Sequence, residues 1–299
     1  MSSTLHYSQC PVCQHHPLAE VFSAKDETVS QQYFKIQECP QCTLRLSQDV
    51  PNAASISDYY KSDTYISHTN TAKGFIHFLY KTVRTLTLRK KRKLVENITG
   101  TRQGNLLDVG AGTGAFVKEM RSAGWSVTGL EPDNDARLVA KNQFDTTLLP
   151  IDHLQQLSAN TFDAITLWHV LEHVHDLNGY IKTLKQLLAT NGKLLVAVPN
   201  YTAKDAAIYQ QHWAAYDVPR HLYHFSPQAM QQLMAKHGLK IVSHQPMWFD
   251  SFYICMLSSK YKNGKVNLVA AFLNGLKSNW HARKNAARCS SVIYVIAPL

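Results

Sequence analysis

The sequence lacks several features that would assign it to a special class of protein. No apolar run approaches the roughly 18 residues that a transmembrane helix needs. The first residues, MSSTLHYSQC, lack the charged-then-apolar pattern of a secretory leader, and no internal repeat or low-complexity segment is present. Charged residues make up only 17% of the 299 residues and hydrophobic ones 45%, which is typical of a folded globular protein. We therefore expect a cytoplasmic protein with one central domain and appendages.

Acidic residues are also few. The chain has 31 Lys and Arg but only 21 Asp and Glu, a formal net charge of +10. Five of the cations are consecutive, RKKRK at 89–93, near the end of a helix expected over 74–96. The run suits a solvated helix face, and equally an anionic membrane surface, an anionic substrate such as a sugar nucleotide, or RNA.

Cysteine is scarce and unevenly placed. Four of the six cysteines fall within the first 42 residues as two pairs, C-P-V-C and C-P-Q-C. Four thiolates in a tetrahedron suit Zn²⁺, whose binding would stabilise a segment too small to fold on its own. Disulfides are the alternative, but a chain without a leader favours a reducing compartment. The expected structural zinc ligands are Cys10, Cys13, Cys39 and Cys42.

The most informative stretch is NLLDVGAGTG at 105–114. A short apolar run, typical of a buried parallel strand, leads into a turn that contains Gly110, Gly112 and Gly114. Glycines permit a sharp turn there and let a ligand lie against bare peptide groups. The turn therefore predicts a small-molecule site at the end of a strand.

Two carboxylates specify the ligand further. Glu131 ends the next apolar run, where its side chain suits a ribose diol. Asp108, just before the glycines, would repel a phosphate and suits a cationic ligand. No Gly-Lys-Ser/Thr follows the turn, which excludes a P-loop. The segment resembles the S-adenosylmethionine site of class I methyltransferases, and the resemblance implies that cofactor.

Alternating helix and strand patterns continue along the chain. The expected fold is α/β: a Rossmann-like, seven-stranded methyltransferase sheet with an N-terminal zinc ribbon and a helical insertion before the last strand. That last strand is expected antiparallel beside the fifth. The seven expected strands are 106–109, 125–130, 146–149, 162–167, 193–198, 240–247 and 291–296.

Three further residues are candidates: two follow expected strands, and the third lies between the cysteine module and the glycine turn. Asp152 follows the third strand, where it could contact the adenine amine or only cap a helix. His169 lies in WHVLEHV after the fourth strand and is expected to line the cofactor, although this segment could equally start a helix. Tyr65 carries a hydroxyl near the expected mouth of the site and is a catalytic candidate.

The segment 213–226, WAAYDVPRHLYHFS, is unusually dense in aromatic and imidazole rings. Ser226 and Pro227 are expected to start a helix as N-cap and first residue. A helix N-terminus would keep nearby histidines neutral and able to accept a proton. His221 is the first candidate for a general base and His224 the second; packing of a loop is the alternative for both.

A second resemblance covers nearly the whole chain. A zinc-binding N-terminal module, a class I core and a histidine-rich segment are similar to the sugar C-methyltransferases, whose pattern is H-E-H-x-x-Y-F-S. The resemblance aligns His221 with that family's base, but Arg220 replaces its glutamate and Pro219 its preceding histidine. The chain is closer to bacterial methyltransferase-domain proteins of unassigned substrate that share Y-D-V-P-R-H-L-Y-H-F-S.

The expected activity is methyl transfer from S-adenosylmethionine to a small acceptor, such as an anionic sugar nucleotide or a cell-envelope glycan precursor. The alternatives are an RNA methyltransferase and a non-catalytic protein with the methyltransferase fold. Nucleic acid and peripheral membrane contact through the basic helix are the other partners considered. The expected divisions are a zinc module over 1–50, a helical extension over 51–97, the core over 98–250, and a helical insertion with the final strand over 251–299.

Overall fold

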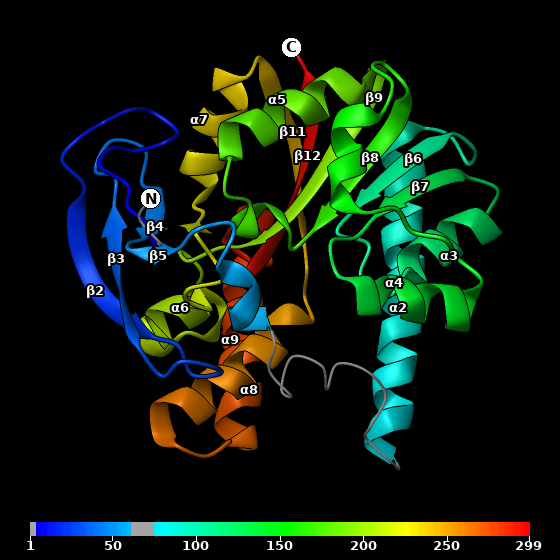
Figure 1. Cartoon of the computed structure of the whole chain (residues 1–299). Helices are drawn as coiled ribbons and strands as arrows, with labels where there is room; N and C mark the ends of the chain where they lie inside the picture. The colour runs from blue at the N-terminus through cyan, green and yellow to red at the C-terminus, as the bar shows by residue number, and fades with distance from the viewer. Residues whose placement is uncertain (1–3, 61–74) are drawn as a thin grey trace.

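The computed structural model describes residues 4–60 and 75–299, and for 75–84 only the backbone. The catalytic candidate Tyr65 lies outside the described residues. A large mixed sheet with helices on both faces forms the body of the molecule, and a smaller N-terminal sheet lies beside it (Figure 1). No helix among the described residues is long and apolar enough to cross a membrane.

The central sheet has six strands in the order β11-β12-β9-β8-β6-β7. β6, β7, β8 and β9 run parallel, whereas β12 pairs antiparallel with both β9 and β11. The expected antiparallel last strand beside the fifth is thus confirmed. The strands are β6 (Asn105–Val109), β7 (Ser126–Leu130), β8 (Phe162–Trp168), β9 (Leu188–Pro199), β11 (Leu239–Pro246) and β12 (Ser291–Pro298).

The strand expected at 146–149 is reduced to a single parallel bridge between Leu130 and Leu149. Pro150 follows immediately as the N-cap of a 3₁₀ helix over Ile151–Gln156, so the chain turns away from β7 after Leu149. The sheet therefore has six strands where the sequence predicted seven, although the chain still runs along the outer edge of β7.

Alternation along the strands creates two apolar faces. Leu106 packs with the buried side chains of α3 (Ala115–Ser122) and α4 (Asn134–Phe144), whereas its neighbour Leu107 packs with those of α5 (Leu177–Leu187) and α7 (Pro227–Lys236).

Among the helices, α7 begins at the residues that the sequence predicts. Ser226 accepts a hydrogen bond from the Ala229 N–H, confirming the expected cap of α7. The helices are α2 (Phe75–Thr99), α3 (Ala115–Ser122), α4 (Asn134–Phe144), α5 (Leu177–Leu187), α6 (Lys204–Tyr209), α7 (Pro227–Lys236), α8 (Asp250–Asn263) and α9 (Leu268–Ala282).

Short 3₁₀ helices connect many of these elements. They are η1 (Ile56–Tyr60), η2 (Ile151–Gln156), η3 (Leu171–His173), η4 (Gln210–His212), η5 (Ala214–Tyr216) and η6 (Ala286–Arg288). η2 and η3 follow the carboxyl edge of the sheet, and η4 and η5 lead into the histidine-rich segment.

The N-terminal sheet borrows a strand from the histidine-rich segment. β2 (Ala19–Lys25), β3 (Tyr33–Glu38) and β4 (Arg45–Ser47) are joined by β10 (Tyr223–His224), which pairs antiparallel with β4. A separate pair is formed by β1 (Thr4–Leu5) and β5 (Val50–Pro51). The N-terminal sheet is therefore hydrogen-bonded to the segment that carries the candidate base.

α8 and α9 form a helical hairpin between β11 and β12. β11 is antiparallel to β12, which is antiparallel to β9, so β11 runs parallel to β6–β9. α8 therefore begins at the carboxyl edge of the sheet, the edge that also carries the glycine turn (Figure 1). The expected helical insertion before the last strand is confirmed.

Candidate active site and metal centre

The glycine turn combines a left-handed backbone with open space at Gly112. Gly110 and Gly112 have φ of 71° and 53°, a left-handed conformation that side chains strain. A Cβ on Gly110 would lie 2.4 Å from a methyl carbon of Val170, so that position is crowded. A Cβ on Gly112 would meet nothing within 4 Å, so the space there is open. Gly114 occupies the N-cap position of α3 with φ of 75°.

Glu131 supports this turn from the end of β7. Its carboxylate is 8% exposed and accepts hydrogen bonds from the N–H groups of Gly112, at 2.7 Å, and Asp133, at 3.0 Å. Burial raises the pKa of Glu131, and the two backbone hydrogen bonds oppose that shift. The carboxylate predicted to bind the ribose is therefore fixed against the glycine turn.

Asp108 is fully buried beneath the turn and accepts a hydrogen bond from Thr166 Oγ1 at 2.7 Å. Burial raises its pKa to about 7, opposed by Thr166 and by the charge of Lys91. Lys91 comes from the basic run on α2, and its ammonium lies 4.2 Å from the centre of the Trp168 ring. Burial lowers the Lys91 pKa, while Asp108 and Asp250 oppose the shift. Lys91 thus favours the carboxylate form of Asp108, but burial outweighs this effect and the Asp108 pKa stays raised.

Other cations of the basic run also have partners inside the protein. Arg92 forms ion pairs with Glu96 at 2.8 Å and Glu119 at 2.9 Å. Lys90 lies 5.1 Å from the centre of the Phe249 ring. Lys90, Lys91 and Arg92 thus contact groups of the protein itself, whereas the side chains of Arg89 and Lys93 are exposed.

His169 bridges the sheet and the α8–α9 hairpin. It follows β8 with φ of 60°, and its ring nitrogens lie 3.3 Å from Glu172 Oε1 and 3.0 Å from Asp250 Oδ2. Burial alone would lower the His169 pKa, but the two carboxylates raise it to about 10. His169 is thus an imidazolium that holds the first turn of α8 against the strand end.

This clamp gives a pH-dependent prediction. In Asp250→Asn, the His169 pKa is expected to fall from about 10 toward the ordinary range near 6.5, because one of its two anionic partners is gone. A histidine pKa raised on folding adds stability that is present below about pH 6.5 and lost as pH rises through the folded pKa. NMR titration of the ring protons and melting curves from neutral to alkaline pH would measure both effects. An unchanged His169 pKa in the variant would contradict the ion pair.

A groove adjoins this edge of the sheet. It has a volume of about 410 Å³ between η2 and α5, and Gln155, Asp176 and Tyr180 are among its lining residues. Burial and the charge of Glu131 raise the pKa of Tyr180, so the groove lies near the ribose-binding candidate. Asp152 is exposed on η2, and Pro150 takes the N-cap position, so Asp152 is not the cap residue.

Glu172, His173 and His221 converge next to the His169 clamp. One ligand-type atom from each lies within 4.8 Å of the others, and the two imidazole rings pack edge to face at 4.6 Å. Glu172 is fully buried, and its Oε2 has no hydrogen-bond partner among the described residues. Burial and the neighbouring His221 lower the pKa of His173 to about 4, so His173 is neutral. Tyr60 and the Arg220 carbonyl both contact His173 Nδ1, so a cation held by this donor set would have to bind His173 through Nε2.

The tautomer of His221 follows from its neighbours. Its Nδ1 lies 2.8 Å from the Ala215 carbonyl oxygen and must donate to it, which leaves a lone pair on Nε2. Asp217 Oδ2 lies 3.8 Å from that Nε2. Arg220 binds Asp217 through two hydrogen bonds and so holds it in place. The arginine that departs from the sugar C-methyltransferase pattern therefore positions a carboxylate beside the histidine.

His224 points in another direction. Its Nε2 lies 3.1 Å from Ser47 Oγ, and its ring packs against Tyr216 at 5.0 Å. Burial and the charges of His221 and Arg45 lower its pKa far below the usual range. His224 thus faces the N-terminal sheet, whereas His221 faces Glu172.

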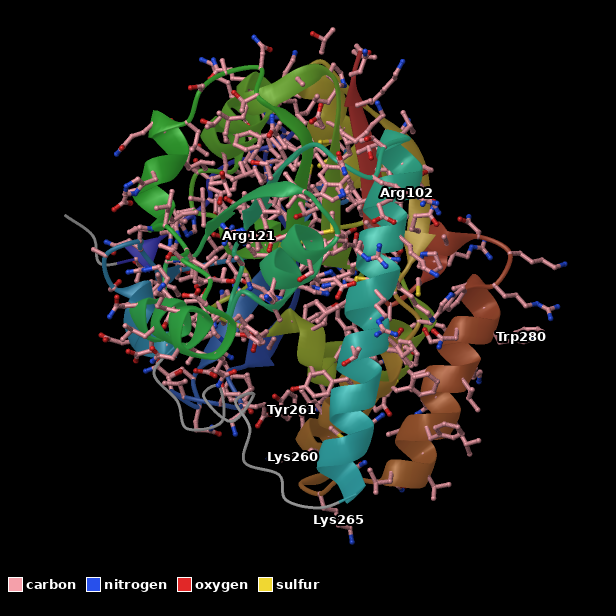
Figure 2. All side chains as sticks on the ribbon, turned by 90° about the vertical axis from the view of Figure 1, so that its right-hand side faces the viewer. Arg102, Arg121, Lys260, Tyr261, Lys265 and Trp280 are labelled. Carbon is pink, nitrogen blue, oxygen red and sulfur yellow. The ribbon has the colours of Figure 1, made fainter. Side chains whose placement is uncertain are left out.

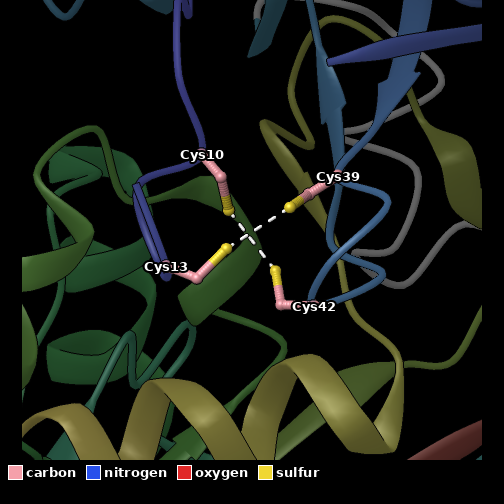
Figure 3. A group of neighbouring side chains, drawn as sticks. All are labelled: Cys10, Cys13, Cys39 and Cys42. Atoms are coloured by element: carbon pink, nitrogen blue, oxygen red, sulfur yellow. Dashed lines mark hydrogen bonds between the residues drawn. The ribbon is translucent and has the colours of Figure 1, made fainter. Parts of the chain in front are cut away.

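The four N-terminal cysteines come together as predicted (Figure 3). Cys10 Sγ lies 3.4 Å from Cys42 Sγ, and Cys13 Sγ lies 3.3 Å from Cys39 Sγ, with all four within 4.8 Å of one another. A zinc tetrahedron with bonds of about 2.3 Å places its sulfurs about 3.8 Å apart, which these positions approach. The four thiols therefore fit a closed structural zinc site.

Both C-x-x-C pairs have the same turn. The N–H of Gln14 donates to the Cys10 carbonyl and that of Thr43 to the Cys39 carbonyl, each at 2.8 Å. Gln14 and Thr43, each directly after the second cysteine of its pair, both have φ of 62°, a left-handed conformation that reverses the direction of the chain. The two halves of the site are related in structure as well as in sequence.

Comparison with known proteins decides the family. The model of a methyltransferase domain family matches residues 76–244, more than half of the chain. The chain belongs to this methyltransferase family. The glycine turn, Glu131, His169 and His221 all lie within the matched range, whereas the cysteine module precedes it.

Curated relatives cover part of this methyltransferase. The ubiquinone biosynthesis O-methyltransferase of Glaesserella parasuis is 31% identical over 136 residues, 42% of this chain and 58% of that protein. The mitochondrial ubiquinone biosynthesis O-methyltransferase of Homo sapiens is 26% identical over 164 residues, 49% of this chain and 44% of that protein. The chain thus spans about half the length of the curated relatives it matches.

A solved structure shares the fold. The magnesium protoporphyrin IX methyltransferase of Synechocystis PCC 6803, solved with bound SAH, superposes with a TM-score of 0.55 and 13% identity. The match covers 83% of this chain and all of that one. This agrees with the class I methyltransferase fold that the glycine turn predicted.

Removing one cysteine ligand tests the metal centre of the methyltransferase. Cys39→Ser is expected to lose bound zinc and to destabilise the N-terminal sheet by several kcal/mol, because metal binding contributes directly to folding such small modules. Metal analysis and the melting curve measure the two effects. Cys255→Ser, at a buried cysteine outside the cluster, is the control and should keep its zinc. Absence of zinc from the wild-type protein would refute the site.

Sequence reasoning missed three residues near His221. Glu172, Asp217 and Arg220 were not selected as site residues, although two of them flank the candidate base within four positions. An Asp three residues before an Arg was the available signal, since such a pair can meet across one turn of chain.

Proposed function

We propose that this methyltransferase uses S-adenosylmethionine as its methyl donor. The open turn at Gly112 and the buried Glu131 suit an adenosine ribose, and the carboxyl group of Asp108 suits a cationic amino acid moiety, whose positive charge would favour its carboxylate form. When bound, the cofactor supplies an electrophilic methyl group on a positive sulfur. Family membership supports this assignment independently of the geometry.

His221 is the proposed general base. Its Nδ1 proton is engaged by the Ala215 carbonyl, so Nε2 can take the proton from an acceptor hydroxyl. Asp217 stabilises the imidazolium that results, and Arg220 keeps Asp217 in place. His224, which faces Ser47, is a positioning residue in this proposal. The rest of the rate enhancement would come from holding the acceptor oxygen in line with the methyl group and the sulfur.

One observation carries this proposal. The carboxyl edge of a single sheet brings together the glycine turn, the His169 clamp and His221, with Glu172 in contact with the clamp and close to His221. A cofactor site and a proton acceptor thus lie along one edge of a fold whose relatives bind ligands there.

The proposed acceptor is a small molecule with a hydroxyl group. The curated relatives are named as O-methyltransferases, which supports an oxygen acceptor and makes an intermediate of ubiquinone biosynthesis one candidate. The resemblance of the histidine-rich segment and zinc module to sugar C-methyltransferases supports a nucleotide-linked sugar as the other. RNA is less favoured, because Lys90, Lys91 and Arg92 are already engaged within the protein.

Calorimetric titration with S-adenosylhomocysteine tests the cofactor assignment first. Micromolar binding is expected, and its absence would withdraw the enzyme claim in favour of a non-catalytic protein. Labelled S-adenosylmethionine is then supplied with sugar nucleotides, hydroxylated quinone precursors or RNA. Label in either small-molecule class supports the proposal, whereas label only in RNA would contradict it.

A further inference from the structure

Helix α9 turns its large apolar side chains toward solvent. At about 100° per residue, the six positions concerned fall within an arc of about 140° on one side of the helix. The exposed fractions are 67% for Leu268, 72% for Val269, 55% for Phe272, 57% for Leu273, 43% for Leu276 and 63% for Trp280. An amphipathic helix normally buries such a face, so this arrangement is inverted.

Hydrogen bonds fix the rotation of α9. Ser278 Oγ donates to Asp205 Oδ1 at 2.6 Å, and Asn274 donates to the Tyr209 hydroxyl at 3.0 Å. The buried side of the helix consists of small residues: Ala271, Gly275, Ser278 and Ala282. A Cβ on Gly275 would lie 2.7 Å from the Phe252 ring, which shows how closely α8 and α9 approach. The apolar face is therefore held outward by specific contacts.

The charged side chains of the segment that contains α9 are all positive. Residues 251–299 contain no Asp or Glu, and every Lys and Arg among them is exposed. These seven cations are Lys260, Lys262, Lys265, Lys277, Arg283, Lys284 and Arg288. Figure 2 shows Trp280 projecting outward from the hairpin and Lys265 at the opposite end of it. Cations thus lie beyond both ends of α9 and beside its apolar face.

We propose that the α8–α9 hairpin docks on an anionic lipid bilayer, with α9 in the plane of the interface. Aliphatic side chains and a tryptophan would enter the boundary between headgroups and acyl chains, while the surrounding lysines and arginines bind lipid phosphates. The helix has 15 residues, about 22 Å at 1.5 Å per residue, so it lies on the bilayer rather than across it.

Charge favours a bilayer over the other occupants of such a face. A symmetric second copy would place seven cations against seven, with no acidic residue in this segment to pair with them. RNA would bind the cations but gain nothing from the exposed Leu268, Val269 and Leu273, which cannot hydrogen-bond to it. Anionic lipid matches both the apolar centre and the cationic surround. The inference rests on α9 and its surroundings and is independent of the proposed activity.

Vesicle flotation with the full-length protein tests the proposal. The wild type is expected to float with phosphatidylcholine vesicles that contain about 30% phosphatidylglycerol, and at least about tenfold less with phosphatidylcholine alone. The triple variant Val269→Gln/Leu273→Gln/Trp280→Gln should lose binding to the anionic vesicles by about tenfold or more. Tyr33→Gln/Leu138→Gln, which removes two exposed apolar side chains elsewhere, should bind like the wild type.

A second variant, which changes the cations and not the apolar face, tests the proposal if the triple variant does not fold. Lys265→Glu/Lys277→Glu/Lys284→Glu leaves the apolar face intact and should abolish the preference for anionic vesicles. Circular dichroism melting curves verify folding of each variant. The proposal is overturned by a wild type that floats with neither vesicle, or by folded variants that bind as well as it does. A wild-type dimer in sedimentation that the triple variant loses would also overturn it, because a second copy would then cover this face.

Discussion

His221→Ala is expected to reduce methyl transfer by about 10²–10⁴-fold while S-adenosylhomocysteine affinity stays within about twofold of the wild type. The variant removes Nε2, the nitrogen whose lone pair is free because Nδ1 donates to the Ala215 carbonyl. The residue is 9% exposed, and the described contacts of its ring are with Ala215, Asp217 and His173, so the cofactor site should remain intact. Initial rates with labelled donor, alongside calorimetry, separate the two effects.

A control and a conservative variant sharpen this test. His237→Ala removes a histidine bound to Asn178 and should leave the rate unchanged. Asp217→Asn keeps the size of the side chain but removes the charge 3.8 Å from His221 Nε2, so it should lower the rate and shift its pH profile. Full activity in His221→Ala would move the base to another residue.

Gly112→Val is expected to weaken S-adenosylhomocysteine binding by about 100-fold or more. The residue has φ of 53°, which a β-branched side chain adopts only at a cost of about 1–2 kcal/mol, and its N–H bonds to Glu131. A valine would also project into the open space beside the turn, where the cofactor is proposed to lie. Both effects act on binding, so calorimetry is the direct measurement.

Gly100 offers a matched control. It has φ of 72°, and a Cβ there also meets nothing within 4 Å, but it lies at the end of α2 away from the turn. Gly100→Val therefore carries a similar backbone strain without occupying the cofactor site, and its affinity should match the wild type. Equal affinities of Gly112→Val and the wild type would remove the cofactor assignment.

Local sequence predicted much of the fold because the relevant signals are local. The glycines of 110–114 fix a turn through their φ, and alternating apolar residues fix the two faces of the strands. Ser226 defines the start of α7 by accepting a hydrogen bond from the Ala229 N–H, and the ring of Pro227 fixes the backbone φ of the first helical residue. The strand expected at 146–149 is reduced to one bridge for an equally local reason, since Pro150 is the N-cap of η2 and the chain turns away from β7 after Leu149.

The contacts of the basic run could not be predicted from the run itself. Five consecutive cations suit a polyanion, but the structure directs Lys91 toward Asp108 and Trp168, and pairs Arg92 with Glu96 and Glu119. A helix distributes successive side chains around its axis, so neighbours in sequence meet different surroundings. Most of their partners belong to segments that are distant in the sequence, so the run alone does not identify them.

The sequence by itself indicated the family, the antiparallel last strand beside the fifth and the four cysteines that come together. Each of these follows from residue type and spacing along the chain. The tertiary structure decided the surroundings of the two histidines: β10 pairs with β4, so His224 lies against Ser47 while His221 meets Glu172. It also decided that α9 exposes its apolar face, because Asp205 binds Ser278 and fixes the rotation of the helix. Such contacts join residues far apart in the chain, and their geometry exists only once the whole fold is formed.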